Sequence, residues 1–229
     1  MREASKLRDQ ISHALLVGSL AAGTSYVVSW ALPLPLAASV TWKGLGVGLL
    51  TLYAALKARN LDGWLICLVM AFGTLGDVVL DAVGPTAGAL AFFGGHVIAI
   101  ALYLRNRRYV LTPRESLVAL MLVPAVLAAS FALTTDRAGW TNTAIYALSL
   151  GLMAATAWTS EFPRNRTGAG ALMFLASDVL IFARFGPLAH APGIGLAIWS
   201  LYFGGQVLIC LGVTGALAKL GPRPVIPAF

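Results

Sequence analysis

The fold is decided by residues 64–83, which read WLICLVMAFGTLGDVVLDAV. The stretch carries no charge except Asp77 and Asp81, both near its end. A helix of about 20 mostly apolar residues is long enough to cross the hydrocarbon core of a bilayer. A charge near the bilayer centre costs at least about 2.5–3.5 kcal/mol on insertion scales. The stretch therefore predicts a membrane span whose Asp77 faces a protein interior or a wet cavity.

The rest of the chain has the same character. Of its 229 residues, 59% are hydrophobic and only 11% are charged, whereas an ordinary soluble domain carries roughly 25% charged residues. A folded soluble surface needs polar cover, so the composition excludes a soluble globular protein, a disordered chain and a disulfide scaffold. Eight apolar stretches follow one another, at residues 12–31, 36–56, 64–83, 86–104, 115–134, 139–160, 168–186 and 194–216. We therefore predict an all-α polytopic membrane protein with eight transmembrane helices in a single transmembrane domain, residues 1–229.

The basic residues set the expected orientation. Of the 16 Lys and Arg residues, all but Lys43, Arg137 and Arg184 fall on one side when the spans alternate. Basic residues gather in cytoplasmic loops, so we expect both termini in the cytoplasm and the protein in the cell membrane. The net charge of +7 then reflects topology and contact with anionic membrane lipids, and its scatter over short loops argues against nucleic acid. The first stretch is too long for a signal-peptide core and no clear small-x-small site follows it, so we expect it to remain as a helix.

Two motifs recur four spans apart. The third span contains GDVVL at residues 76–80 and the seventh contains SDVL at 177–180. The spans that follow them contain FGGHVI at 93–98 and FGGQVL at 203–208. This order predicts a parallel duplication of four plus four helices, although the Gly-Gly pairs also serve close packing in lipid. The expected halves are about residues 1–110 and 111–229.

Polar side chains inside the spans mark a candidate site. At about 1.5 Å of rise per residue, Lys43, Asp77 and Tyr146 lie roughly 10 Å from the outer edge, and Asp178 and His96 lie near the midplane. This common depth predicts one pocket between the midplane and the outer half of the membrane. Its candidate residues are Lys43, Asp77, Asp81, His96, Tyr146, Asp178, Tyr202 and Gln206.

Each candidate also has a structural interpretation. One carboxylate would suffice for helix packing, so we expect Asp77 and Asp178 to form a functional pair. A counter-ion and a catalytic group are equally consistent with Lys43. A packed core residue fits His96 slightly better than a proton carrier, and Asp81 fits the outer interface better than the site. Tyr146, Tyr202 and Gln206 have two alternative roles: they line the pocket, or they form hydrogen bonds between helices. The His and Cys residues lack metal-ligand spacing, so we expect no metal and no cofactor.

These residues together resemble a known family. Gly76-Asp77-x-x-Leu80, the Phe-rich run that ends at His96, and Gly170-Ala-x-x-Phe174-x-x-Ser177-Asp178 are similar to motifs of the YhhN-type lysoplasmalogenase family. Tyr202 with Gln206, and Lys43 in the second span, extend the resemblance over about residues 43–212. Two positions depart from the family pattern: Gly44 stands where proline often follows the lysine, and Ala99 stands where tyrosine is frequent. The departures bear on substrate range more than on the chemistry.

The resemblance implies an integral membrane hydrolase that cleaves the vinyl ether of lysoplasmalogens. Its products are a fatty aldehyde and a glycerophospho-headgroup. Vinyl ethers hydrolyse by rate-limiting protonation at carbon, which produces an oxocarbenium ion. Such chemistry needs a general acid and a nearby negative charge, the division of roles found in the carboxylate pairs of glycosidases. We expect Asp77 and Asp178 to fill these roles, with Lys43 or His96 binding the lipid phosphate or tuning the carboxylates.

Three other functions stay open. An intramembrane aspartyl protease also uses two Asp residues on two helices, but its Gly-x-Gly-Asp motif is absent, since the chain reads Thr74-Leu75-Gly76-Asp77. A transporter or a sensor of a small lipid-like molecule would fit parallel repeats and a midplane polar pocket, although no span is clearly interrupted by a proline. A hydrolase of another lysolipid would keep the fold and change only the substrate.

Overall fold

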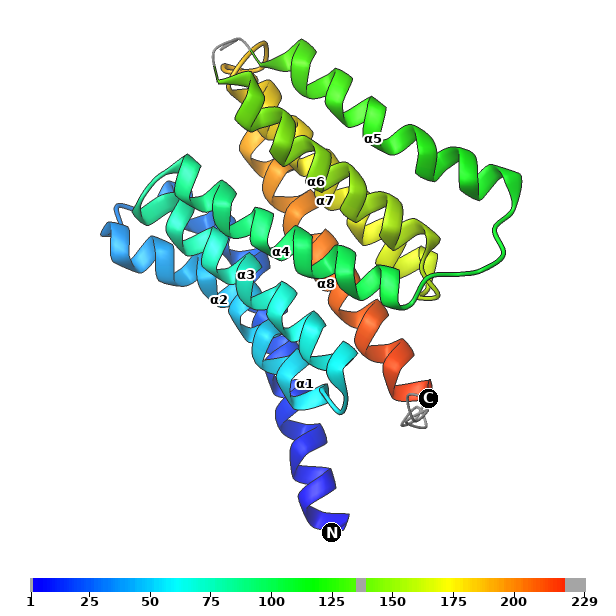
Figure 1. The fold of residues 1–229 in the computed structure, drawn as a ribbon. Helices are drawn as coiled ribbons and strands as arrows, with labels where there is room; N and C mark the ends of the chain where they lie inside the picture. The colour runs from blue at the N-terminus through cyan, green and yellow to red at the C-terminus, as the bar shows by residue number, and fades with distance from the viewer. Residues whose placement is uncertain (1, 135–138, 221–229) are drawn as a thin grey trace.

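The computed structural model describes residues 2–134 and 139–220 as a bundle of eight long helices (Figure 1). Short 3₁₀ and π segments extend the first and seventh helices. The elements are α1 Arg2–Ser25, η1 Tyr26–Ala31, α2 Leu36–Lys57, α3 Leu61–Ala82, α4 Pro85–Arg105, α5 Pro113–Leu133, α6 Trp140–Thr159, η2 Arg164–Gly168, α7 Ala169–Arg184 and α8 Ile194–Leu220. The all-α prediction is therefore confirmed for the described residues, which contain no β-structure beyond one isolated bridge between Arg107 and Ser160.

Local sequence explains the helix ends. The side chain of Asn60 caps α3 by accepting a hydrogen bond from the backbone N–H of Gly63 at 2.9 Å. Thr112 and Glu115 form a capping box at the start of α5. Gly84 adopts φ +136, which a side chain rarely permits, and so turns the chain between α3 and α4 within two residues.

Among the described residues, six helical segments are long and apolar enough to cross a membrane. They are Lys6–Ala31, Leu61–Ala82, Pro85–Arg105, Pro113–Leu133, Arg164–Arg184 and Ile194–Lys219. The helices α2 and α6 have the length but more polar residues, such as Lys43 in α2 and Asn142 in α6. The chain is thus a multi-pass membrane protein. Large apolar side chains face outward in the middle of the helices, for example Leu90, Val97 and Leu120, as contact with lipid requires.

Each half of the chain packs mainly within itself. Figure 1 shows α1 to α4 as one group and α6 to α8 as another, with α5 along the outer side of α6. The helices α4 and α6, and likewise α2 and α8, join the two groups. Pro124 lies inside α5, but it does not interrupt the helix, which is continuous from Pro113 to Leu133.

The two Gly-Gly motifs make equivalent contacts. A Cβ atom on Gly94 would lie 2.7 Å from the Phe72 ring, and one on Gly204 would lie 2.8 Å from the Met173 methyl group. Phe72 and Met173 each stand five residues before the aspartate of their span. In both halves, then, the Gly-Gly motif lets its helix approach the preceding helix at the same place.

The start of α1 and the end of α8 lie at the same end of the bundle (Figure 1). Three ion pairs connect neighbouring helices near the loops at this end. Lys57 pairs with Asp9 at 3.1 Å, Arg105 pairs with Asp62 at 2.9 Å, and Arg164 pairs with Glu115. Most described Lys and Arg residues belong to these segments, while Arg137 and Arg223 lie outside the described residues.

Candidate active site

A cavity of about 960 Å³ lies between the two helix groups. Its lining includes residues at or beside the α3–α4 and α7–α8 connections, such as Pro85, Phe185 and Gly195, so it lies toward the end opposite the termini. Ligand pockets typically measure about 300–1,000 Å³, so this cavity has room for a lysolipid. Six of the eight predicted site residues line it: Lys43, Asp77, Asp81, Tyr146, Asp178 and Tyr202.

Asp77 is held by a tyrosine from the other half of the chain. It projects from α3, is only 2% exposed, and accepts a hydrogen bond of 2.8 Å from the Tyr202 hydroxyl of α8. The Gly73 carbonyl lies 3.3 Å from the same hydroxyl and offers it a second acceptor. Tyr202 can therefore stay hydrogen-bonded whether the Asp77 carboxyl is ionised or protonated.

Asp178 has a matching but simpler environment. It projects from α7, is 5% exposed, and accepts a hydrogen bond of 2.6 Å from the Tyr146 hydroxyl of α6. Within the described residues, this is the one acceptor found for Tyr146. Each carboxyl group thus borders the cavity and is oriented by a tyrosine, so the two candidate acids are fixed in direction.

Lys43 pairs with Asp81 rather than with either candidate acid. Its Nζ atom lies 2.8 Å from Asp81 Oδ1, across α2 and α3. The side chain of Lys43 is 9% exposed and that of Asp81 is 26% exposed. Because an opposite charge beside it offsets much of the cost of burying the ammonium group, this geometry favours the counter-ion interpretation of Lys43.

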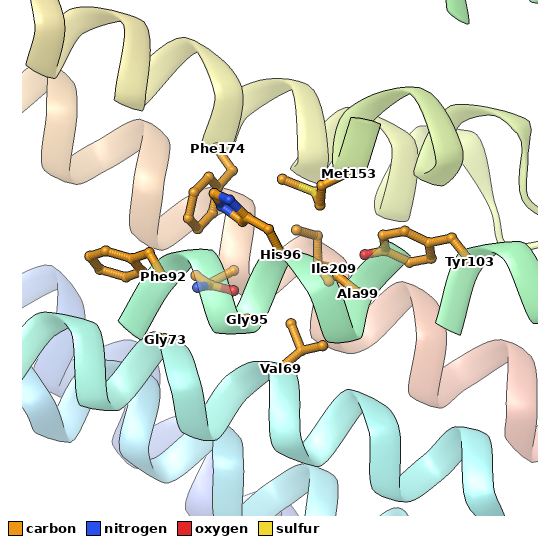
Figure 2. A pocket seen from close by; sticks show the side chains of 11 residues that line it. Val69, Gly73, Phe92, Gly95, His96, Ala99, Tyr103, Met153, Phe174 and Ile209 are labelled. Carbon is orange, nitrogen blue, oxygen red and sulfur yellow. The ribbon is translucent and has the colours of Figure 1, made fainter. Parts of the chain in front are cut away.

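His96 and Gln206 are not among the residues that line this cavity. Both line a second, internal cavity, drawn in Figure 2, whose residues include Phe92 and Phe174. The ring of Phe92 borders both cavities. The eight predicted residues therefore line two neighbouring cavities instead of one, and both cavities share the side chain of Phe92.

Sequence reasoning missed several residues that line the large cavity. Arg184 stands in the last turn of α7, and Trp199 stands one turn before Tyr202. The helical spacing of Asp178, Ile181 and Phe182, and of Trp199 with Tyr202, places these residues on shared faces. That periodicity is the signal that could have identified them. Trp30, at the end of the first apolar stretch, also borders the cavity.

The arrangement provides two oriented carboxyl groups, an exposed arginine and apolar walls. Such a site can transfer a proton, stabilise a developing cation and hold an amphipathic molecule by its charge and its chain. In the described part of the chain, no three His, Cys, Asp or Glu residues are grouped so that they could hold a metal ion.

Comparison with known proteins adds the family. The family model described as the YhhN family matches residues 38–213, which covers α3 to α7 in full, most of α2 and α8, and both aspartates. No curated protein and no solved structure matched the chain.

Proposed function

Because the chain belongs to the YhhN family, we propose that it is a lysoplasmalogenase, an ether hydrolase of alkenyl-glycerophospholipids. It would cleave the vinyl ether of a lysoplasmalogen into a fatty aldehyde and a glycerophospho-headgroup. The observation that carries the proposal is the pair of buried carboxyl groups, Asp77 and Asp178, each oriented by a tyrosine around one lysolipid-sized cavity.

The reaction assigns one role to each carboxyl group. A carboxylic acid gives its proton to the β-carbon of the vinyl ether, and the resulting oxocarbenium ion is stabilised by the other group as a carboxylate. Water adds to the cationic carbon and returns a proton to the first carboxylate. The hemiacetal then collapses, its C–O bond to glycerol breaks, and the glycerol oxygen takes up the hydroxyl proton as the aldehyde leaves.

We assign the acid to Asp77 and the carboxylate to Asp178. The hydroxyl of Tyr202 has the Gly73 carbonyl as a second acceptor, which suits a group that changes between protonated and ionised forms. The hydroxyl of Tyr146 has its acceptor in Asp178, and an ionised acceptor strengthens such a bond. The geometry supports this division of roles.

The lining of the cavity suggests how the lipid lies. The phosphate would contact Arg184, which has no ion-pair partner among the described residues. Lys43, the other basic residue of the lining, is already paired with Asp81. The alkenyl chain would run along apolar side chains such as Leu80, Ile181 and Phe182. His96 lines the other cavity, so we no longer place it at the phosphate.

The same proposal includes the arrangement in the membrane. Eight spans would place both termini on one side, as their common end in Figure 1 supports. The basic loops at that end would face the cytoplasm of a cell whose plasma membrane holds the protein. The equivalent contacts of the two Gly-Gly motifs support a parallel four plus four duplication within the single domain.

The test is aldehyde release from a purified lysoplasmalogen in detergent or liposomes. Asp77→Asn and Asp178→Asn should each abolish most of the activity while the protein still folds. Asp62→Asn is a matched control, because Asp62 is a buried aspartate on α3 whose partner is Arg105 at the far end of the bundle. Near-normal rates of aldehyde release in both site variants would contradict the proposal.

Transport or sensing of a lipid-like molecule is the second candidate. The observation that favours it is the position of the cavity between the two helix groups, where transporters of repeated design hold their substrates. Proteoliposomes separate the two functions: a transporter moves unchanged solute, whereas the hydrolase forms aldehyde without a gradient. A panel of ether and ester lysolipids would identify a hydrolase of a different lysolipid.

A further inference from the structure

Three buried polar groups line the internal cavity without a protein partner. His96 Nε2, the Tyr103 hydroxyl and Gln206 Oε1 are buried and make no hydrogen bond within the described residues. All three residues line the cavity, together with apolar neighbours such as Met153 and Ile209. In Figure 2 the Tyr103 hydroxyl points along α4 toward His96. An unpaired buried polar group costs about 1–3 kcal/mol, so three beside one cavity indicate that the cavity holds a hydrogen-bonding partner.

The hydrogen bonds around His96 fix what its Nε2 atom needs. Ser149 Oγ donates to the Tyr146 carbonyl at 2.7 Å. Its single proton is thereby used, so at 3.1 Å it accepts from His96 Nδ1. A neutral imidazole protonated on Nδ1 presents a lone pair on Nε2. His96 therefore requires a donor from the cavity.

The same reasoning orients Gln206. The hydroxyl proton of Tyr202 is directed to Asp77 or to the Gly73 carbonyl. The Tyr202 oxygen consequently accepts from Gln206 Nε2, at 3.4 Å. The amide oxygen of Gln206 is then the atom left without a partner, and it too requires a donor.

We propose that this cavity binds ordered water, held by His96 and Gln206 at one end and by Tyr103 at the other. Water donates two hydrogen bonds, which match His96 Nε2 and Gln206 Oε1, and accepts one, which matches the Tyr103 hydroxyl. A cavity needs about 10–15 Å³ of room for the centre of a water-sized sphere to hold one water, and this cavity offers about 20 Å³. The site has both the size and the hydrogen-bonding groups that bound water requires.

The water links to the catalytic proposal through Gln206. By fixing the Gln206 amide, it keeps Nε2 directed at Tyr202, which in turn holds Asp77. Gln206 is thus a positioning residue for the acid, and this step rests on the proposed hydrolase function. The water site itself stands on the three buried groups and does not depend on the reaction.

The water is tested by X-ray hydroxyl-radical footprinting of the full-length protein in detergent. Radiolysis of a bound water oxidises the side chains beside it, and methionine is converted to its sulfoxide. Met153 borders the cavity and is 2% exposed, while Met70 is equally buried, at 0%, and does not line it. Met153 should be oxidised several-fold faster than Met70. Equal rates for the two methionines would overturn the water site.

A variant tests the assigned ligands. Tyr103→Phe removes one hydroxyl group and should bring Met153 oxidation down toward the Met70 rate, whereas Tyr53→Phe on α2 should leave it unchanged. Unchanged Met153 oxidation in folded Tyr103→Phe would overturn the three-residue site. The comparison of methionines in the unmodified protein needs no variant, so a misfolded variant does not remove the test.

The positioning role has its own kinetic readout. Gln206 lines no part of the large cavity, so Gln206→Met should lower kcat about tenfold, the effect of one lost hydrogen bond, and leave KM unchanged. A raised KM with unchanged kcat would contradict this role. Rapid Met153 oxidation without any aldehyde formation overturns the hydrolase proposal alone, and aldehyde formation with equal methionine rates overturns the water site alone.

Discussion

The Tyr202 hydroxyl donates a 2.8 Å hydrogen bond to Asp77 across a separation of 125 residues, from α8 to α3. Tyr146 does the same for Asp178, from α6 to α7, at 2.6 Å. The bonds differ in one respect: Tyr202 has the Gly73 carbonyl as an alternative acceptor at 3.3 Å. That difference distinguishes the two carboxyl groups, which the sequence alone presents as equivalent.

Tyrosine-to-phenylalanine substitutions should separate the two carboxyl groups. Tyr146→Phe removes a bond to an ionised acceptor, worth about 1.5–3 kcal/mol, and should slow aldehyde release roughly 10- to 100-fold. Tyr202→Phe removes a bond to a neutral group, worth about 0.5–1.5 kcal/mol, and should slow it about tenfold or less. Steady-state rates on one lysoplasmalogen measure both, with Tyr53→Phe as control. A larger loss in Tyr202→Phe would reverse the assignment of acid and carboxylate.

The contact between α7 and α8 at Gly170 should be intolerant of a methyl group. A Cβ atom on Gly170 would lie 2.7 Å from the Gly205 carbonyl oxygen and 3.0 Å from the Ile209 backbone nitrogen. Gly170→Ala should therefore cost about 1–3 kcal/mol of stability and lower the unfolding temperature.

Gly48→Ala is the control for that substitution. A Cβ atom on Gly48 would make only an ordinary 3.4 Å contact with Thr74, and alanine favours helix over glycine by about 1 kcal/mol. Its unfolding temperature, followed by tryptophan fluorescence in detergent, should stay level or rise. A Gly170→Ala protein as stable as the Gly48→Ala protein would show that the two helices can separate without cost.

The helices could be predicted from the sequence because each apolar run must hide its backbone from lipid. The predicted start of α2 at residue 36 and of α8 at residue 194 match the structure. The first helix, however, begins at Arg2 instead of residue 12, since a helix can extend beyond the bilayer into water. Its polar first turns, with Lys6 and Arg8, carry no apolar signal.

The candidate site was less predictable because depth does not determine direction. Depth alone suggested a common pocket for Asp77 and His96, but His96 hydrogen-bonds to Ser149 and lines the neighbouring cavity. The side chain that both cavities share, Phe92, looks like any apolar span residue in the sequence. Helix rotation also determines which charged side chains form ion pairs, as the pairing of Lys43 with Asp81 shows.

The ion pair of Lys43 and Asp81 leads to a test of the lysine's role. Lys43→Met leaves Asp81 without its partner beside the site, so both stability and activity should fall. If Lys43 is only a counter-ion, the double variant Lys43→Met/Asp81→Leu removes both charges and should recover most of the stability and the aldehyde release. Unfolding temperature and rate are measured on the same preparations. A double variant that is stable but inactive would instead make Lys43 a participant in the reaction.

Arg184 should distinguish lipids that carry a phosphate from those that do not. It borders the cavity at the end of α7 and has no ion-pair partner among the described residues. Arg184→Gln should raise KM for a lysoplasmalogen about tenfold or more, because a charge-assisted hydrogen bond to phosphate is worth about 1.5–3 kcal/mol. KM for an alkenylglycerol, which lacks the phosphate, should not change. Arg59→Gln, an exposed arginine at the opposite end of the bundle, is the matched control. If Arg184→Gln weakens the two substrates equally, Arg184 does not contact the phosphate, and the lipid lies in the cavity in another direction.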